Sequence, residues 1–320
     1  MENTLVSLIV ITYNSSKYVI ETLESIKSQT YENIELVISD DCSVDDTITV
    51  CQSWIEMNSS RFVKTKVITH NVNTGITPNC NRGILASGGI WLMLVGADDA
   101  LLPDCVENNI EFINHNREAR VVHSQSFRYL NEFTQENCIG IRDFTKLAIT
   151  HPAVTSEDQY QILLRGSKVN AATTFFQRSL VDEFVLFDEE IPMIDDWPFW
   201  LKITAAGIKI SFLNKITANY RIRNDSVCNE NQGPGLYGNH HLRTRRIYTK
   251  YILPNVSFIE RFFINYEYYR IIFCQKMRID TRYPIRRLVF LVISAPSVMY
   301  LKWKERKTEE MVKKHLQYLA

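Results

Sequence analysis

The first 120 residues alternate between two apolar patterns, and this alternation restricts the folds that the chain can adopt. Residues 5–12 and 35–40 are nearly continuous runs of apolar and β-branched residues, as in strands that are covered on both faces. Further candidates are strands at 64–70 and 90–95 and helices at 17–29, 45–57, 78–86 and 103–116. Strands that alternate with helices predict a mostly parallel, doubly wound α/β sheet.

The alternation loosens after residue 120. Residues 171–177 fit a strand, 194–206 a helix and 209–223 a pair of strands, whereas 224–238 are rich in Asn, Gly and Pro and predict a mobile loop. We therefore expect an α/β domain over residues 1–225 and a basic, aromatic-rich helical region over 226–320.

Composition indicates a globular chain in a reducing compartment. With 320 residues and 45% hydrophobic content, a large core can form. The seven cysteines are odd in number and scattered without a C-x-x-C pair, which argues against disulfides and a zinc site. No signal-peptide pattern opens the sequence, and the longest uncharged apolar run, 288–301, is shorter than the roughly 20 residues that a spanning helix needs. We expect a cytoplasmic protein, with peripheral contact at the inner face of the membrane as an option.

Charge is divided unevenly along the chain. Residues 1–241 carry 19 Lys and Arg against 30 Asp and Glu, a net charge of −11, whereas residues 242–307 carry 15 against 4, a net charge of +11. Cations mixed with aromatic residues fit helices that lie on an anionic membrane surface. The alternative is a helical domain that packs 262–264 into its own core, at a contact between copies of the chain. No nucleic-acid-binding motif accompanies the basic segment, so nucleic acid is not an expected partner.

Polar residues follow each predicted strand of the N-terminal half. They are Thr12-Tyr13-Asn14, Asp40-Asp41, Asn71 to Gly75, and Ala97-Asp98-Asp99. In open α/β sheets, ligands bind beyond the carboxyl ends of the strands, where these segments would meet. Three of the four ends carry groups suited to a charged, polar ligand.

The adjacent acids Asp98 and Asp99 can serve two partners, because successive side chains point in different directions. In a nucleotide-sugar site, one carboxylate would bind ribose hydroxyls and the other a divalent ion that bridges the diphosphate. The alternative is a turn in which Asp99 or Asp104 caps the next helix.

A third acidic cluster, Asp195-Asp196-Trp197, stands at the start of the 194–206 helix. A carboxylate there could remove a proton from an acceptor hydroxyl, and the aromatic residues could contact a sugar ring. An N-cap followed by core aromatic residues would explain the same pattern.

The segment TYNSSKY after the first strand contains no glycine. A dinucleotide fold needs G-x-G-x-x-G at this place, and nucleotidyl transfer to a sugar phosphate would need a comparable Gly-rich loop. Both alternatives are therefore disfavoured.

Four segments, in this order and at these separations, resemble the glycosyltransferase family 2 enzymes over about residues 5–225. They are VSLIVITYNSSKYVIETLESIKSQTYENIELVISDDCSVDDT, NVNTG, ASGGIWLMLVGADDALLPD and IDDWPFWLKITAAG. The resemblance implies a GT-A fold and inverting transfer of a sugar from a nucleotide diphosphate donor, in particular a UDP-sugar. The implied acceptor is a glycan or a lipid-linked oligosaccharide in surface polysaccharide synthesis.

The resemblance also implies roles for individual residues. Thr12 and Tyr13 frame the base, Asp41 hydrogen-bonds it, Asp98 lies near the ribose, Asp99 binds Mn²⁺ or Mg²⁺, and Asp196 is the catalytic base. Asp195 stands where the family usually has Glu, and with Trp197 it is an acceptor-binding candidate.

The chain departs from the family pattern at several positions. Ile11 replaces a proline, and Cys80-Asn81-Arg82 stands where Arg-Asn is frequent, with Asn81 kept as a donor-binding candidate. These departures leave open a sugar-nucleotide-binding protein without turnover. A homo-oligomer is also compatible with the sequence.

Overall fold

The computed structural model describes residues 3–191, 196–223, 244–277 and a set of positions between 289 and 310. The strands are β1 (Val6–Thr12), β2 (Ile34–Asp40), β3 (Lys64–Thr69), β4 (Trp91–Gly96), β5 (Ala100–Leu101), β6 (Val121–Leu130), β7 (Cys138–Arg142), β8 (Phe175–Gln177) and β9 (Ile210–Ile222). The α-helices are α1 (Val19–Lys27), α2 (Thr47–Asn58), α3 (Ile76–Ala86), α4 (Cys105–His115), α5 (Ser156–Leu163), α6 (Ser179–Phe184), α7 (Asp196–Ala205), α9 (Arg245–Ile247) and α10 (Phe258–Lys276). Short 3₁₀ or π-helical segments lie at Ser59–Arg61, Ala148–Thr150, Ala171–Thr173, Tyr248–Ile252 and Leu253–Asn255.

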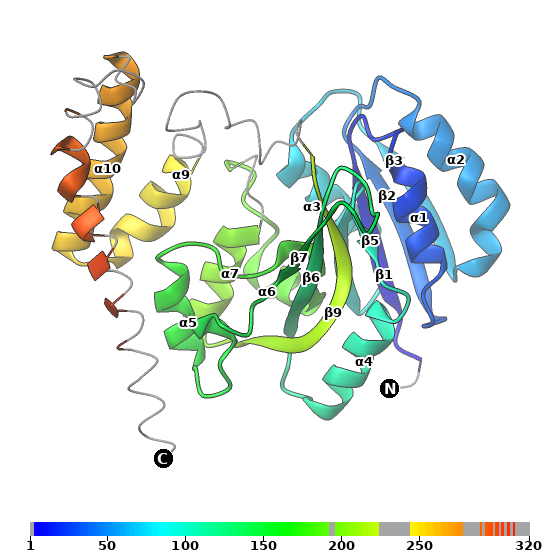
Figure 1. The fold of residues 1–320 in the computed structure, drawn as a ribbon. Coiled ribbons are helices and arrows are strands. Elements are labelled where there is room, and N and C mark those ends of the chain that lie inside the picture. Colours follow the sequence, from blue (N-terminus) through cyan, green and yellow to red (C-terminus); the bar gives the residue numbers. More distant parts are fainter. Residues whose placement is uncertain are drawn as a thin grey trace.

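One sheet runs through the molecule in the order β3-β2-β1-β4-β8-β6-β9-β5, with β7 paired to β6 (Figure 1). β1 pairs in parallel with β2 and β4, and β2 in parallel with β3, as the alternation of strands and helices predicts. β8 is antiparallel to both β4 and β6, so β6 and its parallel neighbour β9 run in the direction of β1. The carboxyl ends of all these parallel strands therefore meet at one edge.

The sheet differs from the sequence expectation in its second half. The region 209–223, expected as two strands, is the single strand β9, because it pairs with β6 through two register shifts without turning back. Within the expected strand 171–177, only Phe175–Gln177 forms a strand, since Ala171–Thr173 forms a 3₁₀ turn. The strand β6 was not predicted. The loop expected at 224–238 lies outside the described residues.

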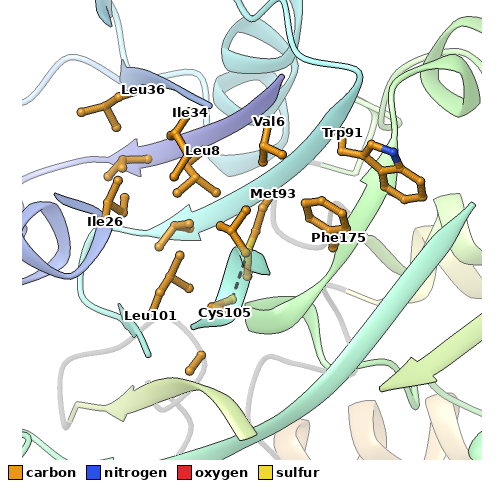
Figure 2. Packing of buried hydrophobic residues seen from close by; sticks show 14 of the residues in the cluster. Val6, Leu8, Ile26, Ile34, Leu36, Trp91, Met93, Leu101, Cys105 and Phe175 are labelled. Atoms are coloured by element: carbon orange, nitrogen blue, oxygen red, sulfur yellow. Dashed lines mark hydrogen bonds between the residues drawn. The ribbon is translucent and has the colours of Figure 1, made fainter. Parts of the chain in front are cut away.

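Helices cover both faces of the parallel strands. The first face buries Val6, Leu8 and Leu36 under α1, α2 and α4, and Figure 2 shows this packing around Met93 and Leu101. The rings of Trp91 and Phe175 stack at 4.9 Å between centroids and close this cluster toward β8. Alternate β1 residues face the other side, where Ile9 packs with residues of α3, α5, α6 and α7.

The C-terminal helical region packs on the second face. Ile247 and Ile252 are buried in its cluster, and the ring of Tyr248 contacts Trp197 edge-on. Arg165 at the end of α5 forms an ion pair of 2.9 Å with Glu260 of α10. Figure 1 shows α10 at the far end of the molecule from α1 and α2. The predicted boundary at residue 225 falls outside the described residues and stays a prediction.

We find no helix, in the ranges that the structure describes, whose length and apolar character would suffice to cross a bilayer.

Candidate active site

Backbone hydrogen bonds hold the ends of β1, β2 and β4 together at the carboxyl edge of the sheet. The N–H of Asp41 donates to the carbonyl of Thr12 at 3.1 Å, and the N–H of Ala97 donates to the carbonyl of Ile11 at 3.2 Å. Asn14 and Cys42, which follow β1 and β2, both have a positive φ, so each strand turns sharply at this edge. The structure thus brings the segments with Thr12, Asp41 and the pair Asp98-Asp99 together.

The Asp41 carboxylate is buried and accepts hydrogen bonds from a loop and from an arginine. Its donors are the N–H and hydroxyl of Thr74, the N–H of Gly75 at 2.6 Å and the guanidinium of Arg82 at 2.6 Å. Gly75 has a φ of 96°, which glycine adopts without strain. Burial alone would raise the Asp41 pKa, but these donors outweigh it and lower the pKa. Asp41 is therefore a fixed anion that holds the loop before α3 in place.

Asp98 and Asp99 follow β4 and direct their carboxylates to different neighbours. Asp99 is buried, and its Oδ1 accepts from the N–H of Arg221 at 2.9 Å. Asp98 is partly exposed, and its Oδ2 lies 3.4 Å from Nε of Arg223. Neither Asp99 nor Asp104 makes the helix cap that the alternative interpretation required, since Asp104 precedes α4 without a side-chain capping bond.

Arg221, near the end of β9, holds the segment of the acid pair in place through several contacts. Its buried guanidinium pairs with Glu21 and donates to the carbonyls of Asn131 and, at 2.7 Å, Asp98. It also lies over the rings of Tyr18, at 4.8 Å, and Phe133, at 3.9 Å. A planar guanidinium with this many partners fixes the backbone at Asp98 and Asp99.

The acid pair fits a divalent cation, the group that the sequence resemblance implies. A Cβ on Gly96 would lie 3.1 Å from Oδ1 of Asp98 and 3.3 Å from Oδ2 of Asp99, so one oxygen of each carboxylate approaches the open face of this glycine. Burial, and next the charge of Asp98, raise the Asp99 pKa well above its usual value. The charges of Arg221 and Arg223 offset only part of this rise, and two adjacent carboxylates of this kind favour a hard cation.

No cluster of three or more His, Cys, Asp or Glu side chains suited to a metal occurs in the described part of the chain. A cation at the acid pair would need further ligands. Mg²⁺ is commonly bound by one or two carboxylates together with substrate phosphates, so diphosphate oxygens could complete its coordination.

Asp196 is the first residue of α7 and is partly exposed. Its Oδ2 accepts a hydrogen bond from the indole N–H of Trp200, one turn later, at 3.0 Å. The hydroxyl of Thr77, at the start of α3, donates to the carbonyl of Ile191 at 2.7 Å, which ties the chain just before α7 to the carboxyl edge. Asp196 also interacts electrostatically with Arg142 of β7. These contacts link the start of α7 to β7 and the segment that leads to it to α3.

The remaining predicted residues differ in accessibility. Tyr13 is 48% exposed, whereas Thr12 is buried and donates its hydroxyl to Asp40 at 2.7 Å. Asn81 is buried, and its amide exchanges hydrogen bonds with the backbone of Phe187 at 2.9 and 3.0 Å. Asn81 therefore positions the chain before α7.

Trp197 does not match its acceptor-binding prediction. It is buried in the second core cluster, and its indole N–H donates to the carbonyl of Leu163 at 2.8 Å. Because the ring is buried and contacts Tyr248, it offers no open face to a sugar. Asp195 lies outside the described residues.

Sequence reasoning missed the residues that support the acids. Tyr18 and Glu21 contact Arg221, and Thr22 donates its hydroxyl to the carbonyl of Asp99 at 2.6 Å. The spacing of 18, 21 and 22 on one helical face was visible, as was the pair of arginines in YRIR at the end of a strand. The sequence did not show that Arg221 contacts these residues and Asp99, because β9 lies more than a hundred residues after Asp99.

Comparisons with known proteins bear on the family and the fold of this chain. The family model described as "Glycosyl transferase family 2" matches residues 7–182, more than half of the chain. The UDP-Glc:alpha-D-GlcNAc-diphosphoundecaprenol beta-1,3-glucosyltransferase WfaP of Escherichia coli is 27% identical over 225 residues, which cover 70% of this chain and 79% of WfaP.

Two solved structures share the fold. The S. aureus TarS fragment 1-349 in complex with UDP-GlcNAc has a TM-score of 0.61 at 19% identity, over 98% of this chain and 92% of that one. The mannosyltransferase PcManGT of Pyrobaculum calidifontis, in complex with GDP-Man and Mn2+, has a TM-score of 0.54 at 16% identity, over 96% and 74% of the two chains. The predicted GT-A fold is confirmed.

Proposed function

This chain belongs to glycosyl transferase family 2, and on that premise we propose that it transfers a sugar, with inversion, from a UDP-sugar to a hydroxyl group. The proposed acceptor is a glycan or a lipid-linked oligosaccharide of a bacterial surface polysaccharide. The names of similar proteins support the choice of a UDP-sugar donor and of a lipid-linked acceptor. WfaP is named for UDP-glucose and a lipid-diphosphate acceptor, and TarS was solved with UDP-GlcNAc. The gathering of Asp41, Asp98 and Asp99 at one edge of the sheet carries the proposal, and the bond from Thr77 to the chain before Asp196 supports it.

The donor would bind across the ends of β1, β2 and β4. Exposed Tyr13 is available to stack on the base, and Asp41 keeps the loop at Thr74 and Gly75 in place beside it. Thr12 and Asn81 contribute indirectly in this proposal, Thr12 through Asp40 and Asn81 through Phe187. Asp98 would receive the ribose hydroxyls.

We assign a divalent cation, Mn²⁺ or Mg²⁺, to Asp99, with Asp98 beside it. When bound, such an ion neutralises the negative charge that develops on a leaving diphosphate. The Mn2+ in the PcManGT complex supports this choice of cofactor. The guanidinium groups of Arg221 and Arg223 lie beside the pair and balance part of its charge.

Asp196 would act as the general base. Its carboxylate takes the proton of the acceptor hydroxyl while that oxygen attacks the anomeric carbon on the face opposite the leaving UDP. The indole N–H of Trp200 orients the carboxylate through Oδ2. Asp195 is kept as an acceptor-binding residue.

Substitution of the base tests this mechanism. Asp196→Asn retains the shape of the side chain but cannot accept the proton, so turnover should fall by about 10²-fold or more, while the affinity for the UDP-sugar stays within about twofold. Asp104→Asn, an exposed carboxylate before α4, is the matched control. If Asp196→Asn keeps more than about a tenth of the turnover, another group is the base.

We further propose a cytoplasmic location with peripheral contact at the membrane through residues 242–307, whose net charge is +11. A lipid-linked acceptor would be presented at that surface.

A further inference from the structure

The helix α10 carries an apolar stripe on its exposed side. Phe258, Phe262, Tyr269, Phe273 and Met277, which follows the helix, recur every four or seven residues and so share one side. All five are exposed, from 48% at Phe273 to 82% at Phe258. Exposed aromatic residues gathered along one helix mark an interaction surface more often than isolated ones do.

The opposite side of α10 is anchored to the protein. Glu260 pairs with Arg165, and Ile271 and Cys274 are buried. Tyr266 donates its hydroxyl to the carbonyl of Ile293 at 2.7 Å, which places part of the following chain against the flank of the helix. These contacts fix the orientation of α10, so that the stripe lies on the side of the helix opposite Glu260, Ile271 and Cys274.

Exposed cations accompany the stripe. Arg261 and Lys276 lie on α10 itself, and Lys302, Arg306 and Lys307 are exposed further along, next to the exposed Trp303. The whole segment 242–307 has 15 cations and 4 acids. Aromatic side chains flanked by Lys and Arg are the pattern of helices that lie in the interface of an anionic bilayer.

From the stripe and its charge we propose that α10 docks the enzyme on an anionic lipid surface. The stripe, defined as Phe258, Phe262, Tyr269, Phe273 and Met277, would enter the headgroup region, and the cations would contact lipid phosphates. A second copy of the chain is a poorer occupant, because the segments 242–307 of two copies each carry a net charge of +11 and would repel each other. The proposal rests on the proposed function only in that a lipid-linked acceptor would be met at such a surface.

Vesicle sedimentation of the full chain tests the proposal. The unmodified protein should sediment with vesicles of mixed phosphatidylglycerol and phosphatidylcholine, bind pure phosphatidylcholine at least about tenfold more weakly, and lose binding as salt is added. Combined Phe258→Ser, Phe262→Ser and Phe273→Ser should weaken binding to the anionic vesicles by about tenfold or more.

Two further variants separate the contribution of the stripe from that of other exposed apolar residues and from that of the cations. Combined Met57→Ser, Val63→Ser and Leu85→Ser removes equally exposed apolar side chains from other surfaces and should leave vesicle binding unchanged. Combined Lys302→Glu, Arg306→Glu and Lys307→Glu should weaken the preference for anionic over neutral vesicles, because the net charge of residues 242–307 falls from +11 to +5. A thermal shift with a UDP-sugar confirms that each variant is folded.

Three outcomes would overturn the docking proposal: the unmodified protein ignores anionic vesicles, the stripe variant binds them as well as the unmodified protein does, or light scattering shows that the stripe instead holds copies of the chain together. None of these outcomes bears on transfer to a water-soluble acceptor, which tests the proposed function separately. Conversely, a catalytically inactive protein that still sediments with vesicles would support docking alone.

Discussion

Arg221 is the residue on which the geometry of the acid pair depends most directly. It contacts residues from α1, from the segment after β6 and from the turn after β4, and its own N–H donates to Asp99. Arginine can make these contacts simultaneously because its guanidinium is planar and carries five N–H donors. It is a positioning residue in the proposed reaction.

Arg221→Lys tests that role. Lysine retains the charge but cannot make all the hydrogen bonds or stack on Tyr18 and Phe133, so the acid pair should become less ordered. We expect the Mn²⁺ concentration for half-maximal transfer to rise about tenfold, with a smaller loss of turnover at saturating metal. Arg120→Lys, at an ion pair with Glu183 away from the site, should leave the Mn²⁺ dependence unchanged.

Gly96 has no side chain, and the carboxylates of Asp98 and Asp99 approach the space that a side chain would occupy. In Gly96→Ala the new methyl group would lie 3.1 and 3.3 Å from their oxygens, closer than ordinary van der Waals contact. Transfer should fall by about tenfold or more as the carboxylates separate, with a weaker response to metal in isothermal titration.

Gly88→Ala is the control for this substitution, since its methyl group would meet the Glu35 carboxylate at an ordinary 3.7 Å. It should retain near-normal transfer. Equal activity of the two variants would show that the space at Gly96 has no role.

At the scale of elements, α3 links the donor side of the site to the start of α7. Thr77 in its first turn holds Ile191, and Asn81 one turn later holds Phe187. Both contacts are formed between side-chain groups and the backbone of a segment more than a hundred residues away. The helix thereby anchors the segment that leads to α7.

Asn81→Ala should destabilise the fold. It would leave the buried N–H and carbonyl of Phe187 without partners, so the free energy of unfolding should fall by about 2 kcal/mol. Urea unfolding measures this change, with Asn137→Ala as the control, because the side chain of Asn137 bonds to Thr134 on the exposed surface. A lower UDP-sugar affinity with unchanged stability would instead indicate direct contact of Asn81 with the donor.

At the scale of the whole molecule, the buried strand β6 makes stability depend on pH. His123 is enclosed by the rings of Phe144 and Phe212, and burial, with a smaller contribution from the charge of Arg142, lowers its pKa from 6.5 to about 3. Below about pH 6.5 the unfolded chain therefore binds a proton that the folded protein does not. The contribution of neutral His123 to the free energy of unfolding is therefore fully present above about pH 6.5 and is lost as the pH falls toward about 3.

The expected loss is about 1.4 kcal/mol per pH unit in this window. Urea unfolding at about pH 7 and about pH 5 should show about 2 kcal/mol more loss for the unmodified protein than for His123→Phe, which cannot titrate. Above about pH 6.5 the difference between the two proteins should stay constant. If the free energy of unfolding changed with pH in the same way for the unmodified protein and for His123→Phe, the pH dependence could not be assigned to His123.

The first half of the fold could be predicted from the sequence because its information is local. Strands such as Val6–Thr12 and Ile34–Asp40 are buried on both faces and appear as uninterrupted apolar runs, and the intervening helices have their own period. The acids at the strand ends then follow from topology, since parallel strands place their carboxyl ends at one edge.

Only the tertiary structure decided which side chains hold those acids in place. β9 is one continuous strand because it pairs with β6, and this pairing places Arg221 within hydrogen-bond distance of Asp99. The sequence left Trp197 as either an acceptor-binding or a core residue, and its contacts with α5 and Tyr248 show that it belongs to the core. Such contacts join residues far apart in the chain, where a periodic pattern reports which face is buried but not which partner covers it.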